Sequence, residues 1–99
     1  MADIFTSTSK AGSVNSEGEV YNKTGQVGRV RLDSGEVFDR GAKKVGYYES
    51  NGYVYDYDTH HIGIVHSDGL VYDYKNNQVG TVKGEPIQAG GAALLLLLQ

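Results

Sequence analysis

Gly18-Glu19-Val20-Tyr21-Asn22 is the first of four copies of one short pattern in this 99-residue sequence. In each copy a valine stands two positions after the glycine, an aromatic residue follows the valine, and Asn or Asp follows the aromatic residue. The copies begin 17 residues apart, at Gly18, Gly35, Gly52 and Gly69. A match at every one of these places predicts tandem repeats of one small structural unit.

The second half of each unit is equally regular. A β-branched residue followed by glycine recurs as Val27-Gly28, Val45-Gly46, Ile62-Gly63 and Val79-Gly80, and Val30, Tyr48, Val65 or Val82 stands two positions later. A degenerate fifth copy precedes the four, because residues 11–18 align with residues 62–69. We therefore expect a single domain over residues 1–99, with repeats at 2–17 (degenerate), 18–34, 35–51, 52–68 and 69–84 and a tail at 85–99.

Each unit is expected to form two short strands. Segments such as 52–58 and 69–75 are rich in Val and Tyr and alternate in polarity, which is typical of β-strands. Short joints rich in Gly, Asn, Asp and Ser separate them, and such residues favour hairpin turns. Connections this short permit only antiparallel neighbours. The sequence predicts an all-β antiparallel meander of about 8–10 strands from four to five hairpin repeats.

The spacing within the second strand predicts apolar groups on both faces of the sheet. Val27 and Val30 are three positions apart, so strict alternation places them on opposite faces. Such a sheet must close on itself or be covered, which favours a coiled or barrel-like meander over a flat sheet or a solenoid. The glycine of the β-branched-Gly pair is expected to leave room for an aromatic ring of a neighbouring strand.

The tail leaves the repeat pattern after Gly84 and ends in Ala92-Ala93 and five leucines, Leu94 to Leu98. We expect this hydrophobic segment to pack on the meander and to cover its open face or bore. A contact with a partner or a membrane surface is the alternative, although no basic residues flank the leucines. The apolar run is too short for a membrane span, which needs about 20 residues.

Composition narrows the classes of function. The net charge is -3 and the chain has no cysteine, so a basic nucleic-acid-binding face and a disulfide framework are not expected. The first ten residues lack the basic and apolar regions of a secretory signal, so a cytoplasmic location is the default expectation. Motifs for a phosphate-binding loop, a zinc protease or a nucleophilic triad are missing, and we expect no enzymatic activity and no cofactor.

The unit resembles short tandem repeats of the form G-x-V-x-D-x-x-G-x-x-V-G-x-V in bacterial and fungal domains of unknown function. Residues 18–30, GEVYNKTGQVGRV, lie close to that pattern, although Asn22 replaces the usual Asp. The resemblance covers about residues 11–84 and implies a β-hairpin repeat fold without catalytic residues. MORN repeats are only loosely similar, because their spacing differs.

Metal binding is weakly indicated. The histidines occur around one repeat only, and His60 and His66 are about 20 Å apart along a strand, too far to share an ion. The column Asp39, Asp56 and Asp73, continued by Asn22, offers one carboxylate or amide per repeat, whereas calcium takes six or more oxygens. We expect these side chains to accept hydrogen bonds from turn amides, and we predict no metal site.

Tyrosines are the best candidates for binding. The aromatic column is expected to pack across strands and fix their register. Exposed tyrosines form stacking platforms for sugars or adhesive patches for proteins, and the binding residues predicted on this ground are Tyr53, Tyr57 and Tyr74. The primary hypothesis is a non-catalytic structural or protein-interaction module that self-assembles through sheet edges and tyrosines. The alternative is a module that binds glycans or the cell envelope.

Overall fold

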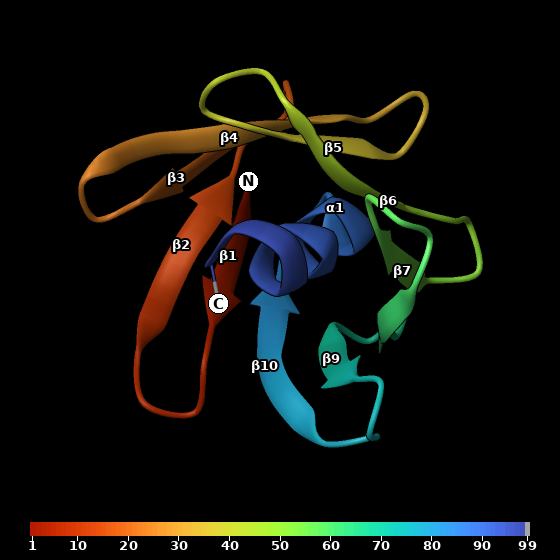
Figure 1. Ribbon diagram of the computed structural model, residues 1–99. Helices are drawn as coiled ribbons and strands as arrows, with labels where there is room; N and C mark the ends of the chain where they lie inside the picture. Colours follow the sequence, from red (N-terminus) through yellow and green to blue (C-terminus); the bar gives the residue numbers. More distant parts are fainter. Residues whose placement is uncertain (99) are drawn as a thin grey trace.

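The structure is a computed structural model and describes residues 1–98. Ten antiparallel strands form a meander in which each strand pairs with its neighbours in sequence, and β1 pairs with β10 to close a barrel (Figure 1). The prediction of an all-β, barrel-like meander is confirmed. The strands are β1 (Ala2–Phe5), β2 (Lys10–Val14), β3 (Glu19–Asn22), β4 (Gly25–Arg31), β5 (Glu36–Asp39), β6 (Lys44–Tyr48), β7 (Tyr53–Asp56), β8 (His61–Val65), β9 (Leu70–Asp73) and β10 (Gln78–Lys83).

The strands group into five hairpins, β1–β2, β3–β4, β5–β6, β7–β8 and β9–β10. The degenerate copy at residues 2–17 supplies the first of them, and its strand β1 closes the ring through the pair Ile4 and Val82. All strands are therefore hydrogen-bonded on both sides. Closure leaves no unpaired sheet edge among residues 1–98, so the expected self-assembly through sheet edges has no structural basis here.

A β-bulge at the same place in every hairpin corrects the prediction of a two-sided sheet. In the β3–β4 hairpin, Val20 pairs with Gly28 and Tyr21 with Gln26, so Val27 is an extra residue in the ladder. Such a residue breaks strict alternation and changes the direction in which the following side chains point. The bulged residues all pack against the core and are Ala11, Val27, Val45, Ile62 and Val79.

Two columns of inward side chains line the barrel. The repeat valines of the first strands and their counterpart Ile4 are fully buried. Val14, Val30, Val65 and Val82 of the second strands are also buried, while Tyr48, at the same position in the β5–β6 hairpin, is half-buried. The repeat pattern therefore places one pair of core residues in each hairpin.

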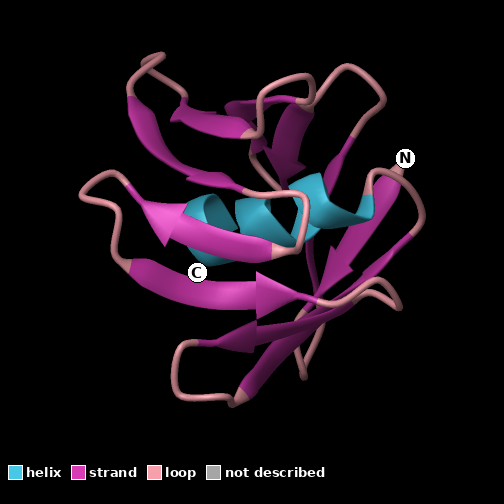
Figure 2. Ribbon diagram, turned by 90° about the vertical axis from the view of Figure 1, so that its right-hand side faces the viewer, coloured by secondary structure: helices cyan, strands magenta, loops and turns pink. Residues whose placement is uncertain are grey.

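The tail forms a helix inside the barrel. It begins after Pro86 as α1 (Ile87–Ala93) and continues as the wider helical turn η1 (Leu94–Leu98), and Figure 2 shows it running through the ring of strands. Small residues allow this close packing, since a methyl group on Gly91 would lie 2.2 Å from Val65. The predicted packing of the tail on the meander is confirmed. No helix within residues 1–98 has the length and apolarity that a bilayer crossing requires.

Each leucine of η1 lies against the bulge glycine of a different hairpin. A Cβ on Gly80 would lie 2.5 Å from Leu94, and one on Gly63 would lie 2.7 Å from Leu95. The same Cβ atoms would also meet a backbone carbonyl oxygen of the paired strand. These glycines therefore make room for leucines and backbone, and the predicted aromatic ring is wrong. The remaining pairs are Leu96 with Gly46, Leu97 with Gly28 and Leu98 with Gly12.

Candidate binding site at the mouth of the barrel

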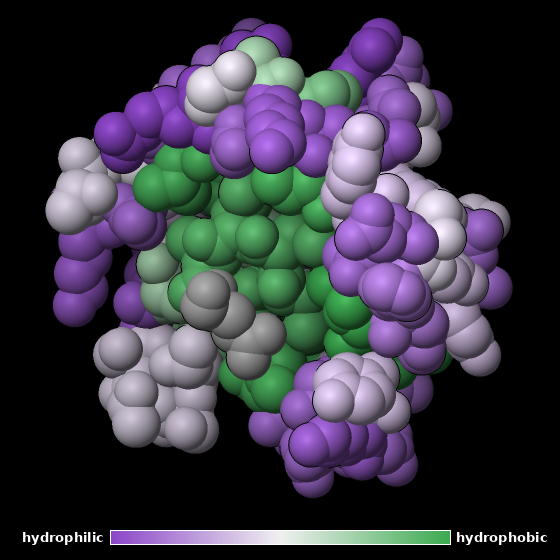
Figure 3. Space-filling model, viewed as in Figure 1, coloured by the Kyte–Doolittle hydropathy of each residue, from purple (hydrophilic) through white to green (hydrophobic). Residues whose placement is uncertain are grey.

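One end of the barrel, which we call the mouth, is ringed by the turns within the five hairpins. Helical turn η1 ends there, and its leucines are half-buried apart from Leu94, which is fully buried. Figure 3 shows an apolar surface at the centre of this face, surrounded by polar side chains. We call this surface the leucine floor, and it consists of Leu95, Leu96, Leu97 and Leu98 with the bulged residues Ala11, Val27, Val45, Ile62 and Val79.

Carboxylates fix the turns around the mouth. Asp39 Oδ1 accepts hydrogen bonds from the backbone N–H groups of Gly41 at 2.9 Å and Lys43 at 3.0 Å. Asp56 and Asp73 accept equivalent bonds in the next two hairpins. The predicted role of this column in binding turn amides is confirmed. Residues 1–98 contain no group of three His, Cys, Asp or Glu side chains that could hold a metal ion.

Asp56 also lies beside a histidine, His60. The backbone N–H of His60 donates to its Oδ1 at 2.9 Å, and His60 Nδ1 lies 3.4 Å from its Oδ2. The hydrogen bond from the His60 backbone is the main reason why the pKa of Asp56 lies below its ordinary value of 3.8, and partial burial opposes the shift. The folded chain therefore favours the ionised form of this side chain.

This lowered pKa predicts a pH dependence of stability. Asp56 contributes stability that is fully present above the unfolded pKa near 3.8 and is lost as pH falls through the lower pKa of the folded chain. We expect Asp56→Asn, which keeps an oxygen acceptor but cannot ionise, to flatten the dependence of the unfolding free energy on pH below about pH 4. Urea unfolding at pH 7, 4 and 3 measures it. An unchanged pH dependence in the variant would contradict the assignment.

The turns around the mouth contain more basic than acidic side chains. The segments 6–10, 22–26, 39–44, 56–61 and 73–78 contain six basic and four acidic residues, a net charge of +2, whereas the chain carries -3. Three of the four acidic side chains are those that bind turn amides. Two of the basic side chains form ion pairs with carboxylates outside these segments, since Lys10 Nζ lies 3.0 Å from Asp3 Oδ1 and Lys44 Nζ lies 3.1 Å from Glu36 Oε2, so the rim with these partners is close to neutral. The basic residues are Lys10, Lys23, Arg40, Lys43, Lys44 and Lys75.

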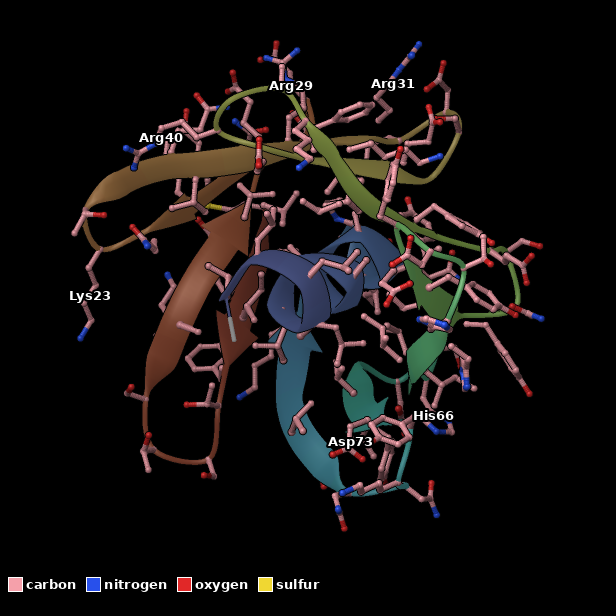
Figure 4. The ribbon with its side chains drawn as sticks, viewed as in Figure 1. Lys23, Arg29, Arg31, Arg40, His66 and Asp73 are labelled. Atoms are coloured by element: carbon pink, nitrogen blue, oxygen red, sulfur yellow. The ribbon has the colours of Figure 1, made fainter. Side chains whose placement is uncertain are left out.

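A groove of about 430 Å³ runs between the β3–β4 and β5–β6 hairpins at the mouth. Arg40 lies beside it on the same side of the molecule as Lys23 (Figure 4), and Arg40 Nε donates a hydrogen bond to the Gln26 carbonyl at 3.1 Å. This bond joins the two hairpins and fixes the guanidinium near the groove. We call this feature the mouth groove, and it is lined by Val27, Asp39, Arg40, Gly41, Val45, Leu96 and Leu97.

The predicted binding tyrosines do not form one platform. Tyr57 and Tyr74 are 66% and 65% exposed and occupy equivalent positions in neighbouring turns of the mouth. Tyr53 is 39% exposed, begins β7 at the opposite end of the strand, and stacks on His61 with ring centroids 4.8 Å apart. The structure therefore places two of the three residues at the mouth.

The aromatic column lies on the outside of the barrel. Tyr55 stacks on Tyr47, its direct partner across β6 and β7, with ring centroids 5.1 Å apart, and it tilts against His61 of β8 at 5.6 Å. Cross-strand aromatic packing is therefore present around Tyr55, as predicted for the column. This packing holds three strands in register and leaves the mouth to other residues.

From the sequence, a contact of the leucines with a partner or a membrane surface was only the alternative to packing, and the mouth groove was not identified. The signal was present, because five leucines follow five hairpin repeats and each repeat has one β-branched-Gly pair, or Ala11-Gly12 in the degenerate copy. The assumption of strict alternation hid this signal. The bulge directs the β-branched residue into the barrel, where the valine three positions later also points.

One protein-family model, described as "4-fold beta flower protein", matches residues 18–93. This span holds the four clear repeats, which form strands β3 to β10, together with helix α1. The β1–β2 hairpin and η1 lie outside it. No curated protein and no solved structure matches the chain.

Proposed function

Because the chain belongs to the 4-fold beta flower family, we propose that it is a non-catalytic binding module whose binding surface is the mouth of the barrel. The leucine floor is the observation that supports this proposal. Leucines that complete a core are normally covered, yet Leu95 to Leu98 remain partly exposed at the centre of one face. An apolar patch with a polar rim is typical of an interaction site.

The mouth takes the place of the sheet edges as the site of partner binding. A closed barrel offers no strand for pairing, so recognition must use side chains. The mouth supplies apolar side chains in the floor, tyrosines on two turns and basic side chains on the rim. The opposite end also exposes apolar side chains, namely Met1, which is 68% exposed, and Leu32 and Tyr53, which are each 39% exposed.

An apolar fluorescent probe tests this proposal. We expect anilinonaphthalene sulfonate to bind the native protein, and the double variant Val27→Thr/Val45→Thr to weaken binding at least ~3-fold because it places hydroxyls in the mouth groove. Probe fluorescence is measured against protein concentration, with circular dichroism to verify folding. Leu32→Ser is the matched control at the opposite end. No binding, or binding that only Leu32→Ser weakens, would contradict the proposal.

Glycan binding remains a second candidate function because of the exposure of Tyr57 and Tyr74 on adjacent turns. Two tyrosine rings on one face offer a stacking surface to sugar rings. Tyrosine fluorescence titrated with oligosaccharides would respond in the native protein and in Tyr53→Ala, but not in Tyr57→Ala/Tyr74→Ala. A response retained by the double variant would exclude these two residues as the site.

A further inference from the structure

The leucine side chains that line the mouth groove cannot move further into the core. Leu96 and Leu97 already lie against Gly46 and Gly28, where a single added carbon would be 2.8 Å and 2.7 Å from them. Their outer surfaces therefore remain available between Val27 and Val45. The groove has a volume of about 430 Å³ and is widely open to solvent.

Arg40 places a positively charged guanidinium beside this groove. Its Nε atom donates to the Gln26 carbonyl, and its guanidinium makes no ion pair within residues 1–98. The terminal nitrogens are therefore free to form the paired hydrogen bonds with which arginine binds carboxylate or phosphate groups. The acidic residue in the groove, Asp39, has one oxygen engaged by two turn amides.

The shape of the mouth favours a slender ligand. The bulged residues lie two to three residues from the turns, and the hairpins extend outward around the floor (Figure 1). An alkyl chain can lie along the leucines between the β3–β4 and β5–β6 hairpins. The Arg40 guanidinium beside the groove, which forms no ion pair within residues 1–98, then favours an anionic group at the end of that chain.

From these features we infer that the mouth groove binds a single-chain amphiphile with an anionic headgroup. The alkyl chain lies on Leu96 and Leu97 between Val27 and Val45, and the headgroup binds the Arg40 guanidinium. This inference rests on the proposed function, which places binding at the mouth, and it adds the chemical class of the ligand.

Three probes separate the contribution of the ligand's alkyl chain from that of its charge. Decanoate supplies both, decyltrimethylammonium has the same chain with a cationic head, and acetate supplies a carboxylate alone. We expect the full chain to bind monomeric decanoate at least ~10-fold more tightly than decyltrimethylammonium and to bind acetate too weakly to measure. Isothermal titration calorimetry below the micelle concentrations gives the affinities, and amide chemical shifts locate the site.

Arg40→Gln is expected to reduce the preference for decanoate over decyltrimethylammonium to about 1, because the exposed side chain is lost without change to the core. Arg31→Gln removes one charge from the end of β4 that lies away from the mouth, and it is expected to keep the ratio. Support requires both results.

Equal binding of both amphiphiles by the native protein would overturn the anionic ligand and leave the mouth as a binding surface. Binding of neither would overturn the proposed function as well. Binding to vesicles of anionic phospholipid without decanoate binding would overturn the single-chain ligand in favour of a bilayer surface.

Discussion

A chain that ends at Gly91 is expected not to form the barrel. The truncation removes Ala92, Ala93 and Leu94, which are 0% exposed, together with the half-buried leucines that contact the bulge glycines. Loss of one buried leucine side chain costs about 2–5 kcal/mol, while a domain of this size is stable by about 5–15 kcal/mol. Near-ultraviolet circular dichroism and urea unfolding are expected to show no cooperative transition.

Two single substitutions measure how much individual leucines of the tail contribute to stability. Leu94→Ala is expected to cost about 2–5 kcal/mol in unfolding free energy because it empties a fully enclosed position. Leu97→Ala is expected to cost less, since Leu97 is half-buried and opens onto the mouth groove. A truncated chain that unfolds with the cooperativity and midpoint of the full chain would show that the strands close without the helix.

Gly63→Ala is expected to destabilise the protein by about 3 kcal/mol or more. The new Cβ would lie 2.4 Å from the backbone oxygen of Tyr72 and 2.7 Å from a methyl group of Leu95. The leucine can rotate, but the carbonyl belongs to the ladder between β8 and β9 and cannot move without loss of strand pairing. Urea unfolding measures the loss of stability.

Gly41→Ala is the control for this substitution. Its Cβ would have only Asp39 Oδ1 nearby, at 3.4 Å, so we expect a change of at most about 1 kcal/mol, which can be stabilising. The double variant Gly63→Ala/Leu95→Ala separates the two contacts. Recovery of stability in the double variant would mean that the leucine, and not the carbonyl, imposes glycine at this position.

Most of the fold could be predicted from the sequence. The copies that begin at Gly18, Gly35, Gly52 and Gly69 predicted repeated hairpins, and short turns limited them to antiparallel pairing. Closure was expected from an incorrect argument, because the apolar residues of the second strands do not face both ways. The bulge at Val27 and its equivalents directs them inward, and the barrel closes around the helix.

The candidate site was harder to predict because it depends on contacts between distant segments. Leu96 and Leu97 meet Val27 and Val45 only after the tail has entered the barrel. Exposure of individual side chains was easier to anticipate, since Tyr57 and Tyr74 interrupt the repeat consensus at positions that lie in turns. Alternation cannot locate a bulge, and composition cannot show which segment fills a barrel.

The pairing of one leucine with one hairpin sets the number of repeats. In open solenoids each unit contacts only its neighbours, so duplication can lengthen the array freely. In this ring a sixth hairpin would bring a bulge glycine that no leucine of Leu94 to Leu98 fills, and a missing hairpin would leave one leucine without its glycine. An ordinary α-helix has 3.6 residues per turn, whereas the five residues of η1 form the wider π-helix. Evolutionary gain or loss of a repeat therefore requires a matching change in the geometry of the central helix, so copy number and helical pitch are coupled in this architecture.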